Sequence, residues 1–139
     1  LRLGYVVACP ELIRRISQVR MRWSVNGMAI AAGEYLVEHP DNDSTGIYRC
    51  LEESQRLQQR LSGIDGITVV PSDTHFFLVR LERGTSAELK TYLAENYGVL
   101  IRDASNFSGL DNRYIRLSAQ RPDENDLLVD LIRRWMQLI

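Results

Sequence analysis

One stretch, GVLIRDASNFSGLDNRYIRLS at Gly98–Ser118, constrains the fold of this chain more than any other. A short β-like run, VLI, leads into Arg102, and a second run, YI, leads into Arg116. The intervening SNFSGLDN is rich in residues of turns and irregular loops. The stretch therefore predicts two strands joined by a loop, each strand carrying one guanidinium group.

Of these two arginines, Arg116 has the stronger need for a partner of opposite charge. Side chains alternate faces along a strand, so Tyr114, Arg116 and Ser118 share one face, and the apolar residues between them can form core. We expect this strand to be largely buried, where an unpaired charge is very costly. The planar guanidinium suits a carboxylate or phosphate bound bidentately. An internal salt bridge to one of the 18 acidic side chains is the alternative that the spacing leaves open.

Composition narrows the function classes. The 139 residues, 45% hydrophobic and 25% charged, suggest one globular domain or a piece of a larger protein. A net charge of −1 argues against nucleic acid as the partner, and no apolar run is long enough for a membrane span. Neither a signal peptide nor a disulfide framework is apparent, so we expect a cytoplasmic protein. Because Leu1 is not a start residue, we expect an internal or C-terminal fragment.

The first forty residues predict one strand and two helices. The run Leu3–Ala8 is typical of a strand, and Pro10 with Glu11 favours the start of a helix. A second helix at roughly Gly27–Glu38 is apolar nearly all round, which predicts burial, and Gly33 in its middle predicts close packing. Residues 39–44 are expected to form a hinge or linker.

The remainder predicts a small α+β fold. Helical periodicity covers about Ser44–Leu61, Thr85 to Glu88 forms a capping box, and Pro122 begins the last helix. Strands are expected at Ile67–Val70 and His75–Leu81, in addition to the two arginine strands. From residue 67 the order is β, β, α, β, β, α, which favours a mainly antiparallel sheet with helices on one face.

The sequence gives no support to most kinds of catalytic or metal-binding site. A metal site is not expected, because His39, His75, Cys9 and Cys50 show no pair at ligand spacing. The sequence contains no nucleophile turn of the Gly-x-Ser-x-Gly type and no glycine loop for phosphate. What remains is arginines from three separate segments, which together predict an anionic ligand with more than one acidic group. They are Arg2, Arg102 and Arg116.

These motifs resemble a known family. Arg2-Leu3-Gly4-Tyr5, the GVLIRD run, the SNF-G-L loop and the YIRLS strand are similar, in this order, to fold-type I pyridoxal-phosphate enzymes of the aminotransferase class I/II family. The resemblance covers essentially the whole chain. Within the family it is strongest to histidinol-phosphate aminotransferases and to the L-threonine O-3-phosphate decarboxylases of cobalamin biosynthesis; Trp23–Asn26 looks more like the decarboxylases.

The resemblance implies a fold and roles. It implies pyridoxal 5'-phosphate (PLP) as cofactor, a phosphorylated amino acid as substrate and a homodimer. Residues 1–40 would be the end of the large PLP-binding domain, and residues 41–139 the C-terminal small domain. Arg2 would bind the cofactor phosphate, Arg116 the substrate carboxylate and Arg102 a substrate phosphate, while Asn26 would line the pocket.

One departure from the family concerns the catalytic lysine. The only lysine, Lys90, lies in the helix that follows the capping box and does not match the family's Schiff-base lysine. The expected fragment therefore contains no catalytic residue and should be inactive alone. A non-catalytic ferredoxin-like module that binds an amino acid or a protein is the alternative, and an RNA-binding sheet lacks the basic excess and aromatic signature that it needs.

Overall fold

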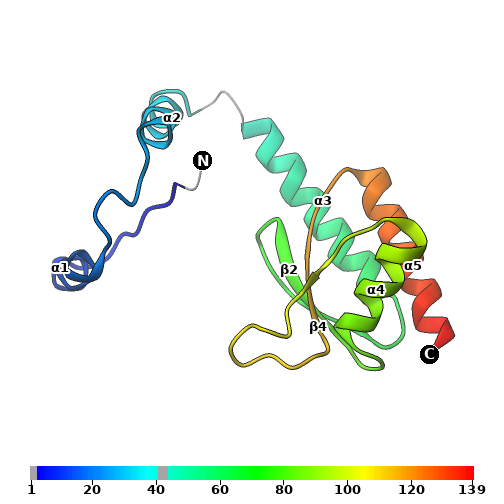
Figure 1. Cartoon of the computed structure of the whole chain (residues 1–139). Coiled ribbons are helices and arrows are strands. Elements are labelled where there is room, and N and C mark those ends of the chain that lie inside the picture. The colour runs from blue at the N-terminus through cyan, green and yellow to red at the C-terminus, as the bar shows by residue number, and fades with distance from the viewer. Residues whose placement is uncertain (1–2, 41–43) are drawn as a thin grey trace. The chain divides into compact units, whose positions relative to one another are not determined.

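The computed structural model describes residues 3–40 and 44–139, so Arg2 lies outside the described residues. The chain divides into two compact units, Leu1–Ser44 and Thr45–Ile139, which are described separately (Figure 1). Their assignment to the large and small domains of a PLP-dependent enzyme stays a prediction. No helix in the described parts of the chain is long and apolar enough to cross a membrane.

The first unit contains the two predicted helices. Helix α1 spans Pro10–Val19, with proline in its first turn and Glu11 near the positive end of the helix dipole. Helix α2 spans Gly27–Glu38, and the Asn26 side chain caps it by accepting a hydrogen bond from the Ala29 N–H at 2.8 Å. Both helices were therefore predicted correctly from local signals.

Two other predictions for this unit are wrong. Leu3–Ala8 forms no strand, because a strand needs a neighbour for its hydrogen bonds and the described residues of this unit provide none. Helix α2 is not buried: among its residues only Ala29 is, since two helices and an extended segment are too few to enclose it. Close packing at Gly33 is confirmed, because a Cβ there would lie 2.5 Å from Leu3 Cδ2.

The second unit has the predicted element order. Helix α3 (Ser44–Ser62) precedes the strands β1 (Ile67–Val70) and β2 (Phe76–Leu81). These are followed by α4 (Ser86–Tyr97), β3 (Arg102–Asp103), β4 (Tyr114–Ser118) and α5 (Pro122–Leu138). The four strands form one sheet in the order β1-β2-β4-β3, and every neighbouring pair is antiparallel.

One face of this sheet forms the core. Alternate residues of β2 and β4 point inward and are buried, and helices α3, α4 and α5 supply the other half of the core (Figure 1). Within residues 45–139 no layer covers the opposite face, which carries polar and charged residues of the strands together with a few apolar ones. Central core residues are Leu57, Leu61, Phe77, Val79, Leu81, Leu89, Leu93, Ile115, Leu117, Ile132 and Trp135.

The ends of α4 are formed by local signals. The predicted capping box is present: the Glu88 N–H donates to Thr85 Oγ1 at 3.2 Å, and the Thr85 N–H donates to Glu88 Oε2 at 2.8 Å. Gly98 ends the helix in the left-handed conformation, with φ of 67°. The Val99 N–H then donates to the Leu93 carbonyl at 3.1 Å, which ties it to the helix end. The third strand consequently begins only at Arg102, later than predicted.

Two glycines with the same backbone conformation allow the cost of backbone strain to be distinguished from the cost of steric overlap with neighbouring side chains. Gly84 and Gly98 both have φ of +67°, but a Cβ on Gly84 would lie 2.5 Å from Trp135 Cη2, whereas a Cβ on Gly98 meets nothing within 4 Å. We expect Gly98→Ala to lower the free energy of unfolding by about 1 kcal/mol through backbone strain. Gly84→Ala should lower it by about 1–3 kcal/mol more, because the buried indole must shift. Urea denaturation of both variants measures the difference, and equal losses would contradict the packing described for Trp135.

Candidate anion-binding site

The two arginines of the 98–118 stretch lie directly opposite each other. Strands β3 and β4 pair in a register that places Arg102 across from Arg116. Side chains at directly opposed positions project from the same face of a sheet. The structure therefore brings together two of the three predicted arginines, from segments 14 positions apart.

Arg116 is exposed, which corrects the prediction of a largely buried strand. The alternation along β4 is as predicted: Ile115 and Leu117 are buried, whereas Tyr114, Arg116 and Ser118 face the other way. Only the face that carries Arg116 is exposed, because the helices of this unit cover the sheet on the other side. Arg102 is exposed too. Both guanidinium groups are therefore accessible to a ligand in this unit.

Neither guanidinium pairs with an acidic side chain in residues 3–40 or 44–139. Arg102 donates instead to the Asn106 side-chain oxygen at 3.1 Å, and its guanidinium carbon lies 5.6 Å from the centre of the Phe107 ring. Arg116 lies at the same distance, 5.6 Å, from the centre of the Phe76 ring. No acidic side chain of the described residues thus forms the internal salt bridge considered for Arg116.

The acid nearest in sequence is directed elsewhere. Asp103 follows Arg102 and, by strand alternation, faces the opposite side of the sheet. Its Oδ1 accepts hydrogen bonds from the Ser105 N–H and the Ser86 hydroxyl, both at 2.8 Å. These two donors, the backbone N–H first, lower the pKa of Asp103 below its ordinary value. The carboxylate therefore joins β3 to α4 and does not pair with Arg102.

Another arginine on the same open face behaves differently. Arg80 lies on β2 opposite Tyr114, and its guanidinium donates to both carboxylate oxygens of Glu82 at 2.7 and 2.8 Å. A hydrogen bond from Thr68, followed by the one from Arg80, lowers the pKa of Glu82. Arg80 is thus neutralised within the chain, which distinguishes it from Arg102 and Arg116.

Two cavities meet at Arg116. The larger, about 610 Å³, is lined by both arginines together with residues of β4 and of the first turns of α5. The smaller, about 320 Å³, is lined by Arg116, Phe76, Phe107 and residues of β1 and β2. Cavities of several hundred cubic ångströms are of the size that binds small molecules. The arrangement can therefore hold an anionic group between the arginines, with space on either side.

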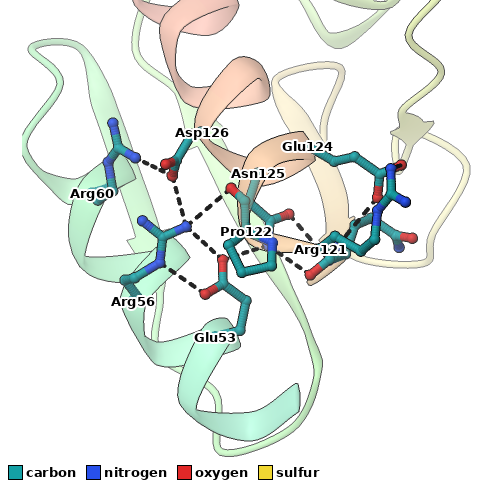
Figure 2. Close-up of polar contacts among 9 residues, drawn as sticks. Glu53, Arg56, Arg60, Arg121, Pro122, Glu124, Asn125 and Asp126 are labelled. Atoms are coloured by element: carbon teal, nitrogen blue, oxygen red, sulfur yellow. Dashed lines mark hydrogen bonds and ion pairs between the residues drawn. The ribbon is translucent and has the colours of Figure 1, made fainter. Parts of the chain in front are cut away.

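A polar network that the sequence did not reveal adjoins the larger cavity, whose lining includes Gln120 and Asn125 of this network. Figure 2 shows the contacts of the network. Asn125, only 1% exposed, accepts from the Gln120 N–H at 3.1 Å and donates to the Gln120 carbonyl at 3.0 Å. It also donates to Glu53 on α3 at 2.8 Å. The same amide thereby holds the turn between β4 and α5 and links it to α3.

Charged groups complete this network. Arg56 donates twice to Glu53, at 2.8 and 2.7 Å, and forms an ion pair with Asp126 at 2.6 Å; Arg60 also pairs with Asp126 (Figure 2). The Arg56 hydrogen bonds are the main cause that lowers the pKa of both Glu53 and Asp126. This cluster balances its own charges, so it holds α3 and α5 together rather than binding an anion.

The structure does not test the other two predicted site residues against this pair. Arg2 lies outside the described residues. Asn26 belongs to the first unit, where its side-chain oxygen caps α2, and its role in a pocket stays a prediction. The described residues contain no group of three His, Cys, Asp or Glu side chains that could hold a metal ion.

Comparison with known proteins identifies the family. The family model for aminotransferase class I and II matches residues 1–132. The chain belongs to this family. The match covers both units, including the first forty residues.

Individual members of the aminotransferase class I and II family agree with this result. The chain is 31% identical over 134 residues to the threonine-phosphate decarboxylase of Salmonella typhimurium, covering 96% of this chain and 36% of that protein. It is 31% identical over 140 residues to the histidinol-phosphate aminotransferase of Hydrogenobaculum sp., covering 100% of this chain and 39% of that protein. The chain thus spans less than half the length of these relatives.

A solved structure of an L-threonine-O-3-phosphate decarboxylase, from Porphyromonas gingivalis, shares the fold. Its TM-score is 0.76 at 39% identity, with 94% of this chain and 40% of that chain covered. The aminotransferase class I and II fold was therefore predicted correctly from the motifs of the sequence.

The pKa shift of Glu53 predicts how stability depends on pH in this family member. Because the native pKa lies below the ordinary value of 4.5, the stabilisation is complete above about pH 4.5 and is lost as the pH falls through the native pKa. Glu53→Gln should lower the free energy of unfolding by about 1–3 kcal/mol at pH 7. It should also flatten the loss of stability in acid. Denaturation curves between pH 7 and 3 measure both effects.

Glu95→Gln is the matched control, because Glu95 is exposed on α4 and makes no contact with the network. This variant should retain the acid sensitivity of the unmodified chain. If Glu53→Gln and Glu95→Gln gave the same pH profile, the network would not be the source of that sensitivity.

Proposed function

We propose that this chain is the C-terminal part of a PLP-dependent enzyme that acts on a phosphorylated amino acid, either as an aminotransferase of the histidinol-phosphate type or as an L-threonine O-3-phosphate decarboxylase. The family membership supports the cofactor and the reaction class. The names of the relatives, which specify threonine phosphate and histidinol phosphate, support the substrate class. In this proposal the chain supplies the substrate-binding side of the site.

The opposed pair Arg102–Arg116 is the observation that carries the proposal. Two like charges directly across a strand pair are unfavourable without a counter-ion, and none of the described acidic side chains provides one. A substrate with a carboxylate and a phosphate offers two anionic groups of suitable geometry. We assign the α-carboxylate to Arg116 and the phosphate to Arg102.

The cofactor contact assigned to this chain is Arg2, which would hold the cofactor phosphate. Arg2 is not among the described residues, so this contact remains a proposal. PLP, when bound, supplies an electron sink for the electrons released as a bond to the substrate Cα breaks. The catalytic lysine that this chemistry requires is not supplied by Lys90, which is exposed on α4. We therefore propose that the chain is inactive alone. From the family resemblance we also propose that the complete enzyme is a homodimer.

Arg116 can influence which bond breaks. A carboxylate held in the plane of the cofactor ring favours loss of the Cα proton, whereas a carboxylate turned perpendicular to it favours loss of carbon dioxide. The strand that carries Arg116 pairs with β2 along its whole length, and the Asn125 hydrogen bonds to Gln120 hold the turn that follows it. A fixed guanidinium imposes one carboxylate orientation, which would select one reaction.

Substitution of Arg116 tests the assignment. In the complete enzyme, Arg116→Ala should raise KM for L-threonine O-3-phosphate or histidinol phosphate by about a hundredfold, because two charge-assisted hydrogen bonds are lost. Cofactor binding, measured from its visible absorbance, should be unchanged. Steady-state assays that detect carbon dioxide and the keto acid separately give KM and also identify the reaction.

Arg80→Ala is the control, because Arg80 has the same side chain on the same sheet face but is neutralised by Glu82. It should leave KM within about twofold of the unmodified enzyme. An unchanged KM in Arg116→Ala would contradict the carboxylate assignment, and equal effects of the two variants would show only a general dependence on positive charge.

A further inference from the structure

The arginine pair raises the question of what holds the two guanidinium groups in place. Most arginines in this unit pair with a carboxylate, as Arg56, Arg80 and Arg113 show. Arg102 and Arg116 are not. Each instead lies beside the face of a phenylalanine ring, at 5.6 Å from guanidinium carbon to ring centre. This distance is within the range of a cation–π interaction.

We propose that Phe76 and Phe107 are positioning residues for the substrate-binding arginines, an inference that rests on the proposed function. A carboxylate would fix a guanidinium but would also cancel its charge. A ring attracts the cation through its quadrupole and adds no net negative charge. The two rings therefore orient the guanidinium groups and leave their positive potential for a carboxylate or phosphate of the substrate.

The placement of Phe76 agrees with this role. Phe76 begins β2 and lies opposite Ser118, which makes it the diagonal neighbour of Arg116 on the same face. Its carbonyl accepts hydrogen bonds from Ser72 at 3.0 Å and from Thr74 at 2.8 Å, so its backbone is fixed. The side chain is nonetheless 44% exposed, unlike its neighbour Phe77 in the core. Packing in the core therefore does not explain this ring.

Phe107 reaches the same place from a different segment. It lies in the loop between β3 and β4, where its N–H donates to the Ala104 carbonyl at 3.0 Å and its carbonyl accepts from the Leu110 N–H at 3.1 Å. These bonds fold the loop back on Arg102, whose second contact is Asn106. Phe76 and Phe107 line the same cavity of about 320 Å³ beside Arg116. Two rings 31 positions apart in sequence thus converge on one pair of cations.

Replacing each ring in the complete enzyme tests the inference. Phe76→Leu and Phe107→Leu keep an apolar side chain but remove the quadrupole, so KM for L-threonine O-3-phosphate or histidinol phosphate should rise about five- to thirtyfold. The change in kcat should be less than threefold, since neither ring touches the reacting atoms. The dissociation constant of inorganic phosphate, measured by calorimetry, should rise by a similar factor. Phe76→Tyr and Phe107→Tyr restore a ring and should restore both values.

The control removes a ring of the same exposure elsewhere. Tyr97, at the end of α4, is 43% exposed and contacts Tyr92 rather than a cation. Tyr97→Leu should leave KM and phosphate binding unchanged. Thermal unfolding of every variant shows whether the fold is retained. Loss of the fold would lower kcat and the melting temperature together, and tyrosine would not rescue it selectively.

The outcomes separate the inference from the proposed function. If Arg116→Ala raises KM but both leucine variants bind phosphate and substrate normally, the rings do not position the arginines and the inference is wrong. If Arg116→Ala leaves KM unchanged, the proposed function fails, whatever the rings do. If the leucine variants raise KM, the tyrosine variants restore it and Tyr97→Leu has no effect, the inference holds.

Discussion

Burial of one face of the four-stranded sheet is the constraint on which the site depends. Phe77 and Val79 of β2 pair with Leu117 and Ile115 of β4, and all four side chains are in the core. A shift of β4 by one residue would place Arg116 in that core and expose its apolar neighbours, so only one register is tolerable. The position of the guanidinium is thus a consequence of apolar burial on the other side of the strand. The pairing of β3 with β4 then places Arg102 opposite it.

Features that depend on neighbouring residues could be predicted from the sequence. The capping box at Thr85, the left-handed Gly98 and the alternation along β4 each follow from a few consecutive residues, and all are present. Features that depend on distant partners could not. The run at Leu3–Ala8 has strand-like composition, but composition does not provide a hydrogen-bonding neighbour. The same limit applies to α2, whose apolar surface predicted burial without saying what would cover it.

The candidate site likewise has features that could be predicted from the sequence and features that could not. Arg102 and Arg116 could be selected from residue type and spacing, whereas their opposition depends on strand register and their exposure on helices covering one face only. The hydrogen bond from Asn125 to Glu53 joins residues 72 positions apart and was not predicted. A signal was present, because Asn125 occupies the inward stripe of α5 with Val129 and Ile132, where a buried amide requires partners.

The chain uses guanidinium groups in two opposite ways, and the placement of acids decides which. Between α3 and α5, Arg56 meets Glu53 and Asp126, and the charges cancel in a contact that serves stability. At β3 and β4 the acid nearest to Arg102 in sequence, Asp103, is turned away by strand alternation and bound to Ser86. The positive potential there is unopposed by the described acidic side chains and costs stability, since like charges face each other across the strands. An anionic ligand removes that cost on binding, so part of its affinity arises from repulsion that the fold holds in place.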